Sequence, residues 1–273
     1  MNVKLAMISL SVAVGVALAA SDLGRAQNGT GCPGDALSDR AYFGHRFNEI
    51  RLHCGELTYR TLDTSNGDWS SRSYRYDLQY EADVPFLALQ DGENERWLAL
   101  WSTDLMFLYE GETVAPFLRG VSETRRRQEA FYYFRDAFSA SSYLTEGDVI
   151  YGPENLGSHE TRKPWVEGVP GQGIGEEIHI DRWFGRLWIS IGFVSYDRPE
   201  LYELNSRPKT IRVVSEATGE ERVVELEDTP NLQPIDVPGD WETASDGGIR
   251  IIIEEVYPGT RWEDTAVNFI VFF

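Results

Sequence analysis

The sequence predicts an all-β protein in two parts, a small antiparallel β-domain followed by a larger β-sandwich. Two observations lead to this prediction. From Gly55 onward, short alternating or continuous apolar runs are separated by turn residues, a pattern typical of strands rather than helices. Hydrophobic residues make up 42% of the chain and aromatic residues 12%, which is enough for a packed core and excludes intrinsic disorder of the whole protein.

The first 20 residues have the features of a secretory signal peptide. A basic start ending at Lys4 is followed by a 16-residue apolar stretch, 5–20, that closes with small residues suited to cleavage. The alternative is a membrane anchor, but the stretch is shorter than the ~20 residues of a spanning helix. We therefore expect an exported protein, periplasmic, cell-surface or secreted, with no stable membrane insertion after the signal peptide (1–20) is cleaved.

Export bears on whether the two cysteines form a disulfide. Cys32 and Cys54 lie 22 positions apart, and an even pair in an oxidising compartment usually closes a disulfide. Such a bridge stabilises by roughly 3 kcal/mol in the chain-entropy model. The alternative is a Cys2His2 metal site with His45 and His53, but neither the C-x2–4-C nor the H-x3–5-H spacing is present. We expect the disulfide and no metal.

The charge balance bears on partners. The chain has 44 acidic and 25 basic residues, a net charge of −19, and removing residues 1–20 takes away one lysine, which leaves 44 against 24, or −20. A polyanion would be repelled by such a surface, so we expect no nucleic-acid partner. The run Arg125-Arg126-Arg127 is the exception, and we interpret it as a solvated face balanced by neighbouring acids.

Residues 32–115 are expected to form the small β-rich domain, whose role the sequence does not indicate. Turn residues, among them Asn66-Gly67-Asp68 and Asp91-Gly92, separate the candidate strands. These strands are 56–62, 74–80, 86–89, 97–101 and 106–109. Five short strands predict a small antiparallel sheet or barrel. Residues 119–138 lack turn signals, and residues 116–138 are expected to be a linker, in which Ser122 is suited to cap a short helix.

Residues 139–273 show clearer strands, with spacing suited to a β-sandwich. The candidate strands are 177–180, 187–191, 210–214, 222–226, 249–254 and 267–273. In the second of these, Leu187, Ile189 and Ile191 are expected to face the core because they alternate.

Catalytic signatures are weak. Gly171-Gln172-Gly173-Ile174-Gly175 looks like a phosphate-binding loop, but a strand pattern rather than a helix follows it, so we expect these glycines to make turns. H-E-x-x-H and G-x-S-x-G are absent. The remaining route is a carboxylate pair drawn from Glu167, Glu176 and Glu177, although close acids are expected by chance among 44. We expect a protein that is not an enzyme.

A set of short motifs follows Phe138 in a fixed order. The motifs are Ala140-Ser141-Ser142-Tyr143, Tyr151-Gly152-Pro153-Glu154, Trp165-Val166-Glu167-Gly168, Gly171-Gln172-Gly173-Ile174-Gly175-Glu176, Asn205-Ser206-Arg207-Pro208-Lys209, Leu226-Glu227-Asp228, Val256-Tyr257-Pro258-Gly259 and Asp264-Thr265-Ala266. Over about 135 residues (273 − 138) this order resembles the NADase-type glycan-binding domain, a discoidin-like, galactose-binding-like jelly roll. The resemblance implies a carbohydrate-binding β-sandwich at residues 139–273. It does not imply cleavage of NAD, because in the toxins of this family that chemistry belongs to a separate domain.

Three segments depart from the family's pattern. An L-D-G-D-type turn is replaced at residues 157–164, the usual I-S-E-I is Val267-Asn268-Phe269-Ile270, and N-G-Y-x-K-S is altered at residues 192–197. In related jelly rolls an acidic turn and a late glutamate help to hold Ca²⁺, which needs six to eight oxygen ligands. Since both acids are missing, a structural Ca²⁺ is doubtful and no cofactor is expected.

Sugar recognition needs a flat apolar face and a few planar polar groups. Trp165 and Trp262 are the aromatic candidates, and Glu167, Asn205 and Arg207 supply an acceptor, an amide and a forked donor. Each of them also has a structural alternative, as core, turn cap or loop brace. The sequence thus favours an exported, non-catalytic protein that binds envelope or host-surface glycans through its C-terminal jelly roll. The alternatives are a secreted glycosidase-like enzyme with a targeting module and a structural envelope protein that makes protein contacts.

Overall fold

The structure is a computed structural model. It describes the residues 37, 40–44, 48–63, 65–90, 95–111, 113–119, 137–158, 163–181, 186–238 and 247–272. The predicted signal peptide (1–20), Cys32, His45 and residues 120–136 of the predicted linker lie outside the described residues. The pairing of Cys32 with Cys54 therefore stays a prediction.

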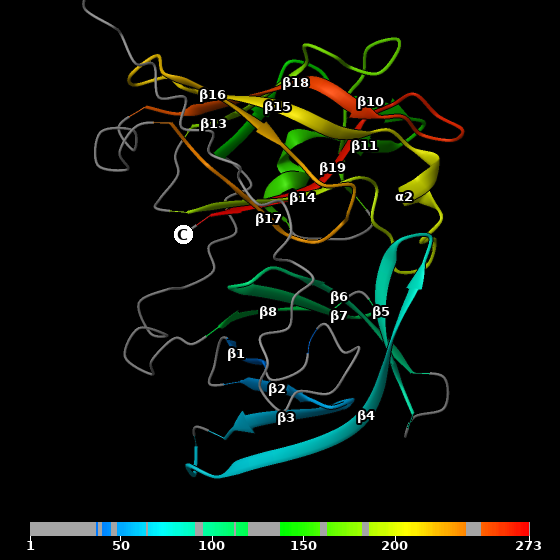
Figure 1. Cartoon of the computed structure of the whole chain (residues 1–273), viewed down its shortest axis with the longest axis vertical. Coiled ribbons are helices and arrows are strands. Elements are labelled where there is room, and N and C mark those ends of the chain that lie inside the picture. The colour runs from blue at the N-terminus through cyan, green and yellow to red at the C-terminus, as the bar shows by residue number, and fades with distance from the viewer. Residues whose placement is uncertain are drawn as a thin grey trace, which may run out of the picture.

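The N-terminal part is a closed barrel of eight antiparallel strands that follow one another in sequence order (Figure 1). The strands are β1 (Arg40–Gly44), β2 (Glu49–His53), β3 (Glu56–Leu62), β4 (Trp69–Glu81), β5 (Val84–Leu89), β6 (Arg96–Trp101), β7 (Leu105–Glu110) and β8 (Thr113–Arg119). The barrel closes where β8 pairs with β1. All five expected strands are present, and β8 runs to Arg119, four residues past the expected boundary at 115.

The barrel interior is filled by side chains, as is usual for eight strands. Every second residue of each strand points inward. The inward set includes Tyr42, Ile50, Leu57, Tyr76, Leu87, Trp97, Ala99, Met106 and Phe117. Cys54 and Gly55 make the turn between β2 and β3, with φ values of 51° and 75°, the left-handed conformation that a two-residue hairpin loop requires. Cys54 thus lies at one rim of the barrel.

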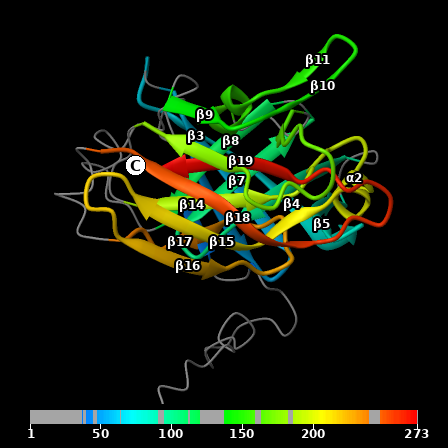
Figure 2. The ribbon, with the colours of Figure 1, turned by 90° about the horizontal axis from the view of Figure 1, so that it is seen from above.

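The C-terminal part is a sandwich of two antiparallel sheets. Its elements are β9 (Phe138–Ala140), β12 (Trp165–Val166), β13 (Glu177–Ile180), β14 (Leu187–Ile191), β15 (Arg207–Ser215), β16 (Glu221–Glu225), β17 (Gln233–Ile235), β18 (Ile249–Tyr257), β19 (Ala266–Phe272), the 3-10 helix η3 (Pro153–Gly157) and the helix α2 (Leu201–Leu204). One sheet has the strand order β16-β15-β18-β13-β9, the other β12-β19-β14-β17. A hairpin of β10 (Leu144–Glu146) and β11 (Val149–Tyr151) extends from the edge of the sandwich (Figure 2).

The two sheets enclose one hydrophobic core. Leu187, Ile189 and Ile191 of β14 all point into it, as predicted. From the other sheet come Ile211, Val213 and, in β18, three isoleucines at alternate positions. The prediction of an all-β protein, with a sandwich preceded by a small antiparallel domain, is confirmed.

A further core joins the barrel to the sandwich, which the sequence analysis did not predict. The outward residues of β5, β6 and β7 meet the outward residues of β14 and β19, so these strands are buried on both faces. Phe107 of β7 and Phe269 of β19 lie with ring centroids 4.9 Å apart. In Figure 1 the four-stranded sheet lies directly above the barrel strands β6 and β7. The two parts therefore bury a common interface.

Candidate functional site

The loops that carry the predicted site residues leave the sandwich at one end. The strands β13, β15 and β19 begin at this end, and their antiparallel partners β12, β14 and β18 finish there. The loops 167–176, 192–206 and 258–265 consequently lie together, on the right of Figure 1 beside α2. We call this end of the sandwich the motif end.

Trp165 lies in the core and not on the surface. Its side chain is 0% exposed and packs among the residues between the two sheets. Its indole N–H donates a hydrogen bond of 3.0 Å to the backbone oxygen of Ser142, so the polar atom is also used inside the fold. Of the two interpretations of Trp165, sugar contact and core residue, its burial supports the core, because burying so large an apolar ring stabilises the fold.

Glu167 is a buried carboxylate that ties three of the sequence motifs together. One oxygen accepts the backbone N–H of Val169 at 2.8 Å and the other that of Thr265 at 3.3 Å. A Cβ at Gly173 would lie 2.5 Å from the side chain of Glu167, so this glycine makes room for it. Burial raises the pKa of Glu167, although both hydrogen bonds act in the opposite direction. Glu167 therefore braces loops instead of facing a ligand.

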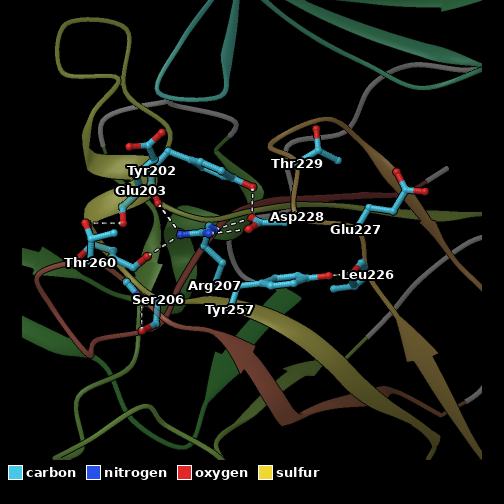
Figure 3. Close-up of polar contacts among 12 residues, drawn as sticks. Tyr202, Glu203, Ser206, Arg207, Leu226, Glu227, Asp228, Thr229, Tyr257 and Thr260 are labelled. Carbon is cyan, nitrogen blue, oxygen red and sulfur yellow. Dashed lines mark hydrogen bonds and ion pairs between the residues drawn. The ribbon is translucent and has the colours of Figure 1, made fainter. Parts of the chain in front are cut away.

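Arg207 is the centre of a buried polar cluster (Figure 3). Its Nε and Nη2 donate to the two oxygens of Asp228, each at 2.7 Å. Its Nη1 donates to the backbone oxygens of Tyr202 and Asn205, each at 3.0 Å. The bidentate pair with Asp228 is the geometry that guanidinium and carboxylate groups favour. With four bonds made inside the protein, Arg207 holds α2 to the loop that follows β16.

Two tyrosine rings enclose this guanidinium. The guanidinium carbon, Cζ, of Arg207 lies 4.7 Å from the ring centre of Tyr202 and 6.0 Å from that of Tyr257. Burial lowers the pKa of Arg207, but its bonds to Asp228 and the nearby negative charges outweigh this, so the net pKa is raised. Burial also raises the pKa of Tyr202, whose hydroxyl donates to Asp228 at 3.1 Å. The polar atoms of Arg207 and Tyr202 are thus used inside the fold.

Asn205 contributes to the same contacts between α2 and its neighbouring loop. Its side-chain amide donates to the backbone oxygen of Leu201 at 2.9 Å, which satisfies a carbonyl of the short helix α2. The residue is 7% exposed. The structural alternative for Asn205 and Arg207 is therefore the one that their contacts support.

Trp262 alone among the five predicted contacts has a partly exposed side chain. Its backbone N–H donates to the carbonyl of Leu204 at 2.9 Å, and that of Thr260 donates to Glu203 at 3.0 Å. The guanidinium of Arg261 lies 4.6 Å from the indole. Ser206 fixes the other side of the loop through its hydroxyl, which accepts the N–H of Gly259 at 3.0 Å. The Trp262 loop is thus held against α2 at several points.

The remaining candidate acids are also engaged. Glu176 accepts hydrogen bonds from the hydroxyls of Ser141 and Ser142. Glu177 forms an ion pair with Arg250 at 3.2 Å, and the ring of His179 lies 3.3 Å from the same carboxylate. The glycine loop leads into β13, as expected for turns. The structure thus gives Glu167, Glu176 and Glu177 three separate sets of partners.

The barrel packs against the motif end through its strand β5. Val84 and Phe86 of β5 belong to the same apolar cluster as Tyr202 of α2, and the β4–β5 hairpin reaches α2 in both Figure 1 and Figure 2. The turn of this hairpin, Ala82 and Asp83, has φ values of 47° and 62°, a strained conformation for residues other than glycine. A chain of contacts thus leads from the barrel through Tyr202 to the Trp262 loop.

Two of the departures from the family's pattern lie at the barrel contact. Phe269, where the pattern has its glutamate, is 0% exposed against Phe107. In the altered segment 192–197, Val194 joins the shared core and the hydroxyl of Tyr196 donates to the backbone oxygen of Arg96 at 2.6 Å. These changes therefore fit the sandwich to its barrel.

Tyr202 and Asp228 were not among the predicted site residues. Asp228 stands in the motif Leu226-Glu227-Asp228, and because a buried arginine needs a partner for its charge, it could have been paired with Arg207 from the sequence. Tyr202 precedes the motif that begins at Asn205 by three residues. Within the described ranges, no three histidine, cysteine, aspartate or glutamate side chains come together as a metal site requires. No helix among those residues is long and apolar enough to cross a membrane.

The comparison with protein-family models agrees with the order of the motifs. Residues 132–273, just over half of the chain, match the family model described as NAD glycohydrolase translocation F5/8 type C domain. A solved structure, the family 32 CBM from C. perfringens NanJ in complex with galactose, is 13% identical with a TM-score of 0.34, covering 52% of this chain and 96% of its own. The comparison with curated proteins found no match.

Proposed function

Since the chain belongs, through residues 132–273, to the family of NAD glycohydrolase translocation F5/8 type C domains, we propose that it is an exported, non-catalytic carbohydrate-binding protein. It recognises envelope or host-surface glycans at the motif end of its sandwich. Export rests on the signal-peptide pattern of residues 1–20, and the non-catalytic role on the lack of H-E-x-x-H and G-x-S-x-G motifs.

The observation that supports glycan contact at this end is the setting of Trp262. Its ring is partly exposed on a loop whose backbone is bonded to Glu203, Leu204 and Ser206. A loop whose backbone is held in this way loses little conformational entropy when its ring stacks on a sugar. The exposed side chains of Arg261 and Glu263 stand beside it, a donor and an acceptor for hydroxyl groups.

The buried motif residues act on binding through position. Glu167, Asn205 and Arg207 contact loops and not solvent, so they set where the Trp262 loop lies. Their loss is expected to weaken binding together with stability. Loss of Trp262 is expected to weaken binding alone.

The test is a glycan array with the mature protein, with and without Ca²⁺. Trp262→Ala is expected to lose the signal while its circular dichroism and thermal midpoint stay unchanged. Val223→Ala is the matched control, because Val223 is 62% exposed on the far strand β16. Absence of binding to any glycan at high micromolar concentration would contradict the proposal.

The enzyme alternative is tested on the same glycans. Each bound glycan is incubated with the mature protein and assayed for new reducing ends. Turnover that is lost in Glu176→Gln or Glu177→Gln would overturn the non-catalytic role. Binding without turnover is the expected result.

A further inference from the structure

The barrel carries an exposed aromatic ring of the kind that sugar stacking needs, whereas the ring of Trp165 is buried. Of the tryptophans that the structure describes, Trp69 is the most exposed, at 41%. It begins β4, opposite Leu62 of β3, on the outer surface of the barrel. An exposed indole matters only if fixed polar groups lie beside it, since single exposed apolar residues are common.

Arg60 supplies such a group. Its guanidinium carbon lies 4.7 Å from the centre of the Trp69 ring, within the range of a cation–π contact. Its Nη1 lies 3.3 Å from Oε2 of Glu49, whose side chain is 6% exposed. The other oxygen of Glu49 accepts a hydrogen bond from Arg51. A buried carboxylate needs cations, so Glu49 holds both guanidinium groups in place.

The strand register adds hydroxyl groups to the same surface. Glu49, Arg60 and Ser71 lie side by side across β2, β3 and β4. Arg51, Thr58 and Ser73 form the next such row, because alternate residues share a face. The hydroxyls of Thr58 and Ser73 lie 3.3 Å apart. We call this surface the Trp69 face.

The two strand rows of the Trp69 face carry more positive than negative charge. Arg51 and Arg60 share the single carboxylate of Glu49, an excess of one positive charge in these rows, whereas Asp63 and Asp68 lie in the turn that joins Leu62 to Trp69. The Arg51 side chain is 59% exposed and that of Arg60 35%. An anionic ligand is attracted to such a surface, whereas the rest of the protein repels it.

We propose that the Trp69 face is a second saccharide site, specific for anionic sugars such as a chain of uronic acids. The pyranose ring stacks on the indole face that Arg60 leaves open, and the sugar carboxylate meets Arg51 and Arg60. Thr58 and Ser73 bond the ring hydroxyls. The site lies on the barrel and does not use the motif end, so it stands or falls independently of Trp262.

The test is isothermal titration of the mature protein with an oligogalacturonate, compared with a neutral cello-oligosaccharide of equal length. The oligogalacturonate is expected to bind, with an affinity that falls as salt rises, because exposed charges are screened. Trp69→Ala is expected to weaken binding about tenfold. Trp69→Phe restores part of it, since a smaller ring still stacks.

The controls separate this site from the rest of the molecule. Tyr80→Ala removes a 55% exposed ring at the other end of β4 and is expected to leave binding unchanged. Arg51→Gln removes the excess positive charge while Arg60 keeps Glu49 paired, and is expected to reduce the salt dependence. Trp262→Ala is expected to bind the oligogalacturonate normally.

Three results would overturn the proposal. They are no binding of oligogalacturonate by the wild type, equal binding by folded Trp69→Ala, and equal binding of the neutral oligosaccharide. None of the three bears on the glycan array of the motif end, so failure here and failure of the proposed function are distinguishable.

Discussion

The two sheets of the sandwich share one core but differ in the chemistry of their outer faces, which is charged on one sheet and apolar on the other. On the five-stranded sheet Arg212 bonds to Glu254 at 2.6 Å and to Glu221 at 3.2 Å, and Arg250 pairs with Glu177. On the four-stranded sheet Phe269 and its neighbours are buried against the barrel. The outer face of the five-stranded sheet is therefore suited to solvent, and that of the four-stranded sheet to permanent contact with the barrel.

The difference between the two outer faces is visible in the strand sequences. Ile249–Tyr257 carries arginine and glutamates on its solvent side, whereas Leu187–Ile191 and Ala266–Phe272 are nearly all apolar. Strands buried on both faces lose the alternation of strands that face water. The same loss marks Arg96–Trp101 and Leu105–Glu110 in the barrel.

The largest expected effect is at the shared core. Phe269→Ala removes a fully buried ring that meets Phe107, and is expected to lower the free energy of unfolding by about 3–5 kcal/mol. Urea denaturation followed by tryptophan fluorescence measures it. Val223→Ala on the other sheet is the control, with an expected change within about 0.5 kcal/mol. A loss below about 1 kcal/mol for Phe269→Ala would contradict the view that the barrel contact is a core.

A smaller effect is expected at the arginine that holds the motif end. Arg207→Met breaks a pair in which the Arg207 side chain is 7% exposed and that of Asp228 36%. A fully buried pair would lose 3–5 kcal/mol, but Asp228 regains some solvent, so we expect about 2 kcal/mol. Arg207→Met with Asp228→Asn should recover part of the loss. No recovery would mean that the bonds to Tyr202 and Asn205 carry the stability instead.

The charged face provides the contrast to Arg207. Arg212→Met removes contacts to two exposed glutamates. The expected change in unfolding free energy lies near the error of the measurement and vanishes in high salt, because exposed ion pairs are screened. A loss as large as that of Arg207→Met would show that this ion-pair network is not merely a solvated surface.

The smallest effect is a difference in pH dependence between two acids. Burial raises the pKa of Glu167 above its ordinary 4.5, so its contribution to stability is full below pH 4.5 and is lost as pH rises through the raised pKa. The hydrogen bond from Lys209 lowers the pKa of exposed Glu255, so its contribution is full above pH 4.5 and is lost as pH falls through the lowered pKa.

Thermal midpoints of wild type, Glu167→Gln and Glu255→Gln between pH 3 and 8 measure this difference. The advantage of wild type over Glu167→Gln should shrink as pH rises above 4.5. The advantage over Glu255→Gln should shrink as pH falls below it. An advantage over Glu167→Gln that grows with pH would mean that the bonds from Val169 and Thr265 outweigh burial.

Three features could be predicted from the sequence alone, namely the all-β class, the core-facing residues of β14 and the family of the C-terminal part. Each depends on a local signal, such as the alternation of Leu187, Ile189 and Ile191 or the motif around Trp165. Such signals indicate that a side chain is apolar or that the backbone turns at a residue. They do not indicate which surface packs against that residue.

Which side chains are buried and which are paired depends on the tertiary structure. Trp165 and Trp69 are the same residue type in strand-like settings, yet one is buried between sheets and the other is 41% exposed on the barrel. Arg207 became a brace because Asp228, 21 positions away, folds back beside it. Burial and pairing of this kind depend on contacts between segments that are distant in the sequence, and these contacts form only when the chain folds.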